Sequence, residues 1–119
     1  MRDHTKLRAF ELSDEVALLV YRVTAEFPKE EEELYGLTSQ MRRAAVSVPS
    51  NIVEGCARDS EADYLRFLDI AFGSLRELQY QLSLSKRLRF LGNPDSSLIE
   101  QKIVETEKVL SSLIRSLRI

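Results

Sequence analysis

The sequence predicts an all-α protein that folds as a four-helix bundle and assembles as a homo-oligomer. Apolar residues recur at steps of three and four in four separate segments, which is typical of amphipathic helices. Only four glycines and three prolines occur in 119 residues, so the chain has little material for the turns of a sheet-rich fold. This length suits one domain, and we expect residues 1–119 to form it.

The first helix is expected from Lys6 to about Glu26, ending where Pro28 disfavours helical geometry in the residue before it. Between Val16 and Val23 only Arg22 is charged, and a helix that is apolar nearly all round must be covered nearly all round. We therefore expect a neighbouring subunit to cover part of it. Its predicted core stripe is Leu12, Val16, Leu19, Val23 and Phe27, with Phe10, Ala17, Val20 and Thr24 beside that stripe.

The segment after this helix is acidic, because Glu30 to Glu33 are four consecutive glutamates. We interpret them as a solvated connection, and the alternative is a site for a cation or a basic partner. Metal sites in helix bundles usually combine inward-facing glutamates with Glu-x-x-His pairs, and His4 is the only histidine here. The sequence therefore predicts no metal site.

The second helix is expected to begin at Thr38 or Ser39, whose hydroxyls can cap the first turn, and to end near Ala57. One row of apolar residues predicts its core side, and this row consists of Leu37, Met41, Ala44, Val48, Ile52 and Cys56. A second apolar row lies about a third of a turn away and contains Val46, Pro49 and Val53. A single bundle core does not absorb both rows, so the second row is a candidate oligomer interface.

Pro49 interrupts this helix, because proline has no amide hydrogen for the carbonyl of Ala45. We expect a kink between Val46 and Ser50. The kink is either a bend that fits the bundle, which we favour, or a notch that binds a ligand or RNA.

The third helix is predicted to start after Ser60, because Ser60 and Asp63 stand at capping-box positions. Its core stripe alternates steps of four and three, as in coiled-coil packing: Tyr64, Leu68, Ala71, Leu75, Leu78 and Leu82. Continued towards Leu91, this helix would be roughly 45 Å long and clearly the longest of the four. Phe67 and Phe72 lie off the stripe and are further candidates for the oligomer interface.

A short turn at Gly92, Asn93 and Pro94 leads into the fourth helix, which should lie antiparallel to the third. Its predicted stripe is Ile99, Ile103, Thr106, Leu110, Leu113 and Leu117.

Enzyme chemistry is not indicated. The chain has no glycine-rich phosphate loop, no zinc-spaced Cys or His pair, no G-x-S-x-G and only one histidine to act as a base at neutral pH. Cys56 lies on the apolar stripe of the second helix, which favours a buried structural thiol over a nucleophile. We expect no cofactor. The N-terminus lacks an apolar run of signal-peptide length, and no segment approaches the roughly 20 apolar residues that cross a bilayer, so we expect a cytoplasmic protein.

Arginines remain the best functional candidates. The formal net charge of −2 excludes phosphate binding over the whole protein surface, so any contact with nucleic acid must be a local patch. The candidates for nucleic-acid binding are Arg42, Arg43, Arg58, Arg66 and Arg76. Salt bridges or interface contacts are the competing interpretation for these five side chains. The tyrosines are interpreted as packing residues and the Lys86, Arg87, Arg89 cluster as cations that favour a helix C-terminus.

Two long motifs carry a family resemblance. Residues 35–55 read YGLTSQxRRAAVSxPSNIxEG and residues 67–82 read FLxIAxGSLxELxxQL, and together they resemble the bacterial four-helix-bundle family of 23S rRNA intervening-sequence proteins. This resemblance implies an up-and-down four-helix bundle that is assembled as a homopentamer, and it implies no known reaction. Related proteins include the accessory variability determinant of diversity-generating retroelements, which works with a reverse transcriptase and its RNA. The function expected by analogy is a non-enzymatic binding scaffold associated with RNA or a ribonucleoprotein, and the alternative is a protein-protein adaptor without nucleic-acid contact.

Overall fold

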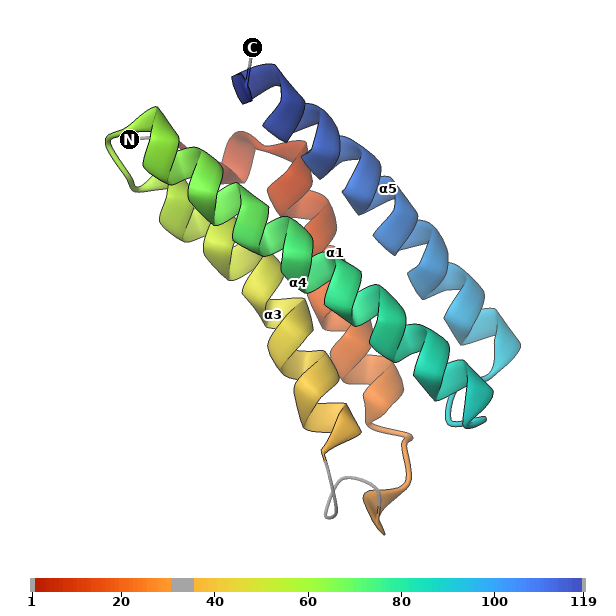
Figure 1. The fold of residues 1–119 in the computed structure, drawn as a ribbon. Helices are drawn as coiled ribbons and strands as arrows, with labels where there is room; N and C mark the ends of the chain where they lie inside the picture. Colours follow the sequence, from red (N-terminus) through yellow and green to blue (C-terminus); the bar gives the residue numbers. More distant parts are fainter. Residues whose placement is uncertain (1, 31–35, 119) are drawn as a thin grey trace.

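The computed structural model describes residues 2–30 and 36–118, and this part of the chain contains helices and short connections but no strand. The 3-10 helix η1 (His4–Lys6) leads into α1 (Arg8–Thr24), and the longer helices α3 (Leu37–Cys56), α4 (Glu61–Arg87) and α5 (Asn93–Arg118) follow. Figure 1 shows that successive long helices run in opposite directions along one axis. The predicted all-α class with four helices is confirmed.

Each long helix packs against two neighbours. In the described residues α1 contacts α3 and α5, and α4 contacts the same two helices, so α1 and α4 face each other across a diagonal (Figure 1). The molecule is elongated, with extents of 44 × 25 × 21 Å. Surface hollows lie between the adjacent helices α1 and α3, α4 and α5, and α1 and α5.

α1 is shorter than predicted, and its buried side is rotated. The steps of four from Leu12 and Val16 continue to Val20 and Thr24, which are buried, while the predicted Leu19 and Val23 are only half-buried. Because α1 is apolar on several sides, its sequence does not distinguish Val20 and Thr24 from Leu19 and Val23 as the buried residues. Thr24 tolerates burial because its hydroxyl donates to the carbonyl of Val20 at 2.7 Å.

The predicted core stripe of α3 is confirmed, since all six of its residues are buried. The predicted cap is wrong. Gly36 is the N-cap, with a left-handed φ of 66° that favours glycine, and it has no side chain with which to cap the helix. The hydroxyl of Ser39 instead donates to the carbonyl of Gly36 at 3.0 Å, and the hydroxyl of Thr38 is buried without a hydrogen-bond partner in the described part of the chain.

α3 continues through Pro49 without an interruption of its helical assignment. Ser47 and Asn51 stand on either side of Pro49. The side-chain amide of Asn51 donates to the backbone carbonyl of Ser47 at 2.8 Å and to its hydroxyl at 3.0 Å. The Ser47 hydroxyl also bonds that of Ser74 on α4, at 2.8 Å. These contacts tie the proline-containing turn to α4, and the kink itself stays a prediction.

α4 and α5 follow their predicted patterns closely. The hydroxyl of Ser60 accepts the amide of Asp63 at 3.0 Å, which confirms the predicted cap, and the whole predicted stripe of α4 is buried. α4 ends at Arg87 after 27 residues, about 40 Å, and exceeds the 26 residues of α5 by only one. On α5 the stripe is buried up to Leu110, after which Ile114 takes the core position predicted for Leu113.

Of the acidic connection after α1, only Glu30 is described, and it is exposed. The predictions for Glu31 to Glu33 lie outside the described residues.

Candidate assembly and nucleic-acid-binding surfaces

The α1–α3 groove is formed by two antiparallel rows of side chains and has a volume of about 410 Å³. The lining residues are Phe10, Asp14 and Ala17 from α1, and Val46, Pro49, Ser50 and Val53 from α3. In both helices these positions repeat at three- and four-residue steps, so each row follows one side of its helix. The second apolar row predicted for α3 therefore lines a real groove.

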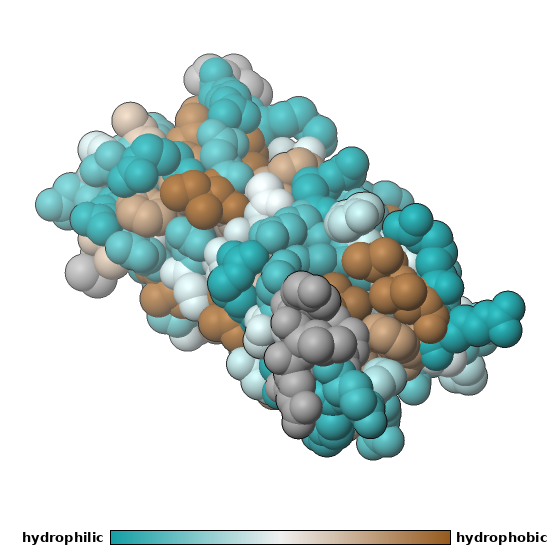
Figure 2. Space-filling model, turned by 60° about the horizontal axis from the view of Figure 1, so that its bottom comes forward, coloured by the Kyte–Doolittle hydropathy of each residue, from teal (hydrophilic) through white to brown (hydrophobic). Residues whose placement is uncertain are grey.

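The predicted interface residues differ in their exposure. Val46 is 40% exposed and Val53 36% exposed, whereas Pro49 is buried between the helices. Asp14 is the only charged residue that lines the groove. Figure 2 shows one face of the molecule, on which apolar side chains gather into separate patches on a largely hydrophilic surface.

Arg42 lies one turn from Val46 and is held against α1. Its guanidinium stacks over the ring of Tyr21 at 4.6 Å, Nε donates to the hydroxyl of Thr24 at 2.9 Å, and Nη2 donates to the carbonyl of Tyr21 at 3.3 Å. All three contacts are with neutral groups. In the described residues no carboxylate forms an ion pair with this half-buried cation.

Arg43 points to the other side of α3, where Nη2 forms an ion pair with Glu77 of α4 at 2.9 Å. The two adjacent arginines therefore contact different helices, α1 and α4. Both arginines, however, make their contacts within the chain. Arg76 likewise forms an ion pair with Glu107 of α5, at 3.3 Å.

The structure brings Arg58 and Arg66 together on a third surface, near the α3–α4 turn. Their guanidiniums lie over the ring of Phe67, at 4.9 and 4.6 Å, and Arg2 lies over the ring of Tyr64 at 4.0 Å. We call these five residues the Phe67 cluster. Phe67, a predicted interface residue, is only 8% exposed because the cluster covers it.

The Phe67 cluster does not present net positive charge. Arg58 forms an ion pair with Glu54 at 2.9 Å, and Arg66 lies 3.9 Å from Asp63. The segments that carry its three arginines, residues 2–6 and 54–66, also carry five carboxylates, those of Asp3, Glu54, Asp59, Glu61 and Asp63. Phosphates are therefore attracted only weakly to the Phe67 cluster.

Phe72, another predicted interface residue, is half-buried on the α4–α5 side. It lines a shallow hollow of about 250 Å³ together with Glu107, Lys108, Ser111 and Arg115. This hollow lies away from the α1–α3 groove, so the five predicted interface residues do not form one surface.

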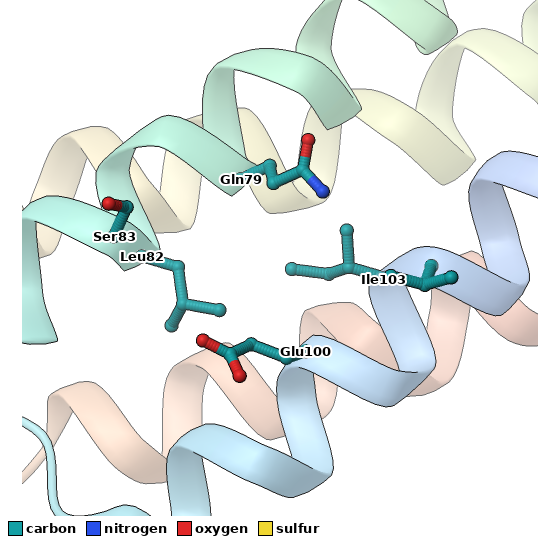
Figure 3. A pocket seen from close by; sticks show the side chains of 6 residues that line it. Gln79, Leu82, Ser83, Glu100 and Ile103 are labelled. Atoms are coloured by element: carbon teal, nitrogen blue, oxygen red, sulfur yellow. The ribbon is translucent and has the colours of Figure 1, made fainter.

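A second hollow between α4 and α5 has a volume of about 270 Å³ (Figure 3). Leu82 and Ile103 approach each other across it and belong to the core, while Gln79, Ser83 and Glu100 supply its polar groups. Nζ of Lys86 engages Glu100 at 2.6 Å. The polar groups of the hollow are thus one amide, one hydroxyl and one carboxylate, and the carboxylate is held in the ion pair with Lys86.

The thiol of Cys56 is buried, as predicted, and burial raises its pKa. Burial also raises the pKa of the neighbouring Tyr64 to about 12. Both groups therefore stay neutral at physiological pH, which suits packing. Among the described residues no group of three or more His, Cys, Asp or Glu side chains is placed to hold a metal ion, and no helix is long and apolar enough to cross a membrane.

Sequence reasoning missed one exposed surface, on the outer side of α4. Tyr80 was interpreted as a packing residue, yet it is 61% exposed and is the most exposed of the large hydrophobic side chains described. Arg87, seven residues later, lies over its ring at 6.0 Å. The seven-residue spacing, which places both on one side of a helix, was the available signal. We call Tyr80, Arg87 and the exposed Arg89 the Tyr80 surface.

Comparison with known proteins places this architecture in a family. None of the curated proteins that were compared matches the chain. A solved structure from Bacteroides thetaiotaomicron, described as a protein of unknown function from the S23 ribosomal protein family, is 26% identical, with a TM-score of 0.77 over 89% of this chain and 97% of that one. The family model described as 23S rRNA-intervening sequence protein matches residues 5–112. The chain therefore belongs to the family of 23S rRNA-intervening sequence proteins.

Proposed function

We propose that this protein is a non-enzymatic scaffold that assembles with copies of itself through the α1–α3 groove and associates with RNA or a ribonucleoprotein. The observation that carries the proposal is the groove itself, where Val46 and Val53 expose apolar surface over the buried Pro49. Covering such surface is favourable, because apolar area leaves water. Five subunits is the number that the family resemblance implies.

Charge substitution within the groove tests the assembly. Val46→Glu or Val53→Glu places a carboxylate in the proposed interface and should dissociate the oligomer, while helical circular dichroism is retained because neither side chain lies in the core. Val104→Glu is a matched control, since Val104 is 42% exposed on α5, away from the groove. Dissociation by Val104→Glu alone would place the interface elsewhere.

Association with RNA is supported by the name of the matching family and by the arginines. Arg42 has no carboxylate partner in the described residues, and outside the Phe67 cluster the ion pairs of Arg43 and Arg76 are exposed on the arginine side. Exposed ion pairs contribute only about 0 to 1 kcal/mol, so a phosphate can replace the carboxylate at low cost. An oligomer repeats each arginine, which strengthens binding through multivalency.

A salt titration of binding to a structured RNA tests this part of the proposal. Affinity should fall steeply as salt rises, because each neutralised phosphate releases counterions. The double variant Arg42→Ala, Arg43→Ala should bind more weakly with the oligomer intact. Absence of binding by the wild-type assembly at low salt would remove the RNA part of the proposal.

A protein-protein adaptor is the second candidate. It is favoured by the carboxylates that already accompany four of the five candidate arginines, together with the formal net charge of −2. Affinity purification from the native cell, with and without nuclease, separates the two candidates. Partners that persist after nuclease treatment support the adaptor, and partners that are lost support association through RNA.

A further inference from the structure

The ring of Tyr80 projects from the outer side of α4 into solvent. With 61% of the residue exposed, its burial contributes little to the core, in contrast to Tyr64 on the same helix, which is 2% exposed. A single exposed ring is ordinary on a protein surface, so Tyr80 gains significance only from the groups that accompany it. Its position on a long regular helix also fixes the direction in which the ring projects.

Positive charge accompanies this ring. Arg87 lies over it at 6.0 Å, the outer limit of a cation–π contact, and its Nε donates to the carbonyl of Ser83 at a long 3.4 Å. Arg89 follows just beyond the helix, where its amide bonds the carbonyl of Lys86. Neither Arg87 nor Arg89 forms an ion pair with a carboxylate of the described residues, whereas the neighbouring Lys86 is engaged by Glu100.

The exposed aromatic face of Tyr80 therefore lies under the guanidinium of Arg87, and the exposed Arg89 follows two residues further along the chain. Every nucleobase has a π-face that stacks on such a ring, and arginine donors suit phosphate oxygens. A duplex keeps its bases stacked inside, so a ring on the side of a helix reaches bases only in a single strand. An acidic peptide would use the arginines but would not require the aromatic ring.

We propose that Tyr80, Arg87 and Arg89 form a binding site for single-stranded RNA, with a base stacked on Tyr80 and the flanking phosphates bound by the two arginines. This inference rests on the proposed association with RNA and adds residues to it that lie apart from the α1–α3 groove. Recognition is tolerant of base sequence, because stacking is common to all four bases. Assembly repeats the site once in each subunit, so a strand that spans neighbouring sites gains effective concentration.

Fluorescence anisotropy with a labelled single-stranded RNA oligonucleotide tests the site on the intact assembly. Tyr80→Phe keeps the ring and should bind like wild type, whereas Tyr80→Leu keeps apolar surface without an aromatic face and should lose roughly five- to a hundredfold in affinity. The double variant Arg87→Ala, Arg89→Ala should reduce the salt slope by about 0.7 for each lost phosphate contact. Its control is Lys108→Ala, Arg115→Ala, which removes equal charge from exposed positions on α5.

Each remaining outcome is decisive. Equal binding by wild type and Tyr80→Leu overturns this site while the association with RNA stands; no binding by wild type overturns both. Preference for the same RNA as a duplex, or equally Tyr80-dependent binding of polyglutamate, also overturns it. The subunit number of Tyr80→Leu is measured in parallel, and a change in that number would assign the ring to a subunit contact instead of RNA.

Discussion

The Phe67 cluster and the Tyr80 surface both combine aromatic rings with arginines, at opposite ends of α4. They differ in how exposed the rings are and in whether carboxylates pair with the arginines. At the first, two guanidiniums cover a ring that is 8% exposed, and carboxylates accompany both of them. At the second, one guanidinium lies loosely over a ring that is 61% exposed, and no described carboxylate pairs with it. Arginines and aromatic rings therefore indicate a binding site only where burial and ion pairs leave them available.

Truncation of the two rings should give the largest contrast. Phe67→Ala removes a ring packed between α3 and α4 and should lower the free energy of unfolding by about 3 kcal/mol. Tyr80→Ala should change it by no more than about 0.5 kcal/mol, because the ring makes few contacts. Urea unfolding at one fixed protein concentration measures both. Similar losses for the two variants would contradict the contrast.

The raised pKa of Tyr64, beside Phe67, predicts a dependence on alkaline pH. The folded protein retains the phenolic proton to about pH 12, while the unfolded chain releases it near pH 10, so the unfolded state binds fewer protons in between. Stability should be unaffected by this group below pH 10 and should fall between pH 10 and 12, by on the order of 2 kcal/mol. Tyr64→Phe should flatten this fall; an unchanged profile in that variant would assign it to another group.

Two glycines should respond in opposite directions to the same substitution. A Cβ on Gly55 would lie 3.0 Å from Cβ of Phe67 and 3.3 Å from the backbone carbonyl of Tyr64, so Gly55→Ala should destabilise the protein by about 1 to 2 kcal/mol. At Gly73, on the outer side of α4, nothing lies within 4 Å, and Gly73→Ala should stabilise the helix by about 0.5 to 1 kcal/mol. Thermal unfolding of the two purified variants measures whether Gly55→Ala lowers stability and whether Gly73→Ala raises it. Destabilisation by Gly73→Ala would mean that another subunit approaches there.

The helices of this protein were predictable to the extent that their apolar pattern was unambiguous. On α3 and α4 a polar strip flanks the stripe, so the buried side followed from spacing alone. On α1 the apolar residues surround the helix, and the choice of Val20 over Leu19 depended on how its neighbours pack. Near the end of α5, a strict seven-residue repeat pointed to Leu113, but a straight helix drifts from that repeat and buries Ile114.

The candidate sites were less predictable, because they depend on contacts between helices. Exposure of Val46 and Val53 followed from an excess of apolar residues on α3. The ion-pair partners of Arg43 and Arg76 could not be predicted from the sequence, because Glu77 and Glu107 lie on other helices, more than thirty positions away in the sequence. The exposure of Tyr80 was missed because a tyrosine at an apolar helical position usually packs, and only the arrangement of neighbouring helices shows that it does not.

Self-assembly is the central claim, and sedimentation velocity of the wild-type protein at micromolar concentration tests it most directly. We predict a single species several times heavier than the 13.7 kDa chain, because the apolar α1–α3 groove must be covered. A uniform species with the mass of one chain would contradict the claim, and the groove would then have to serve a different partner.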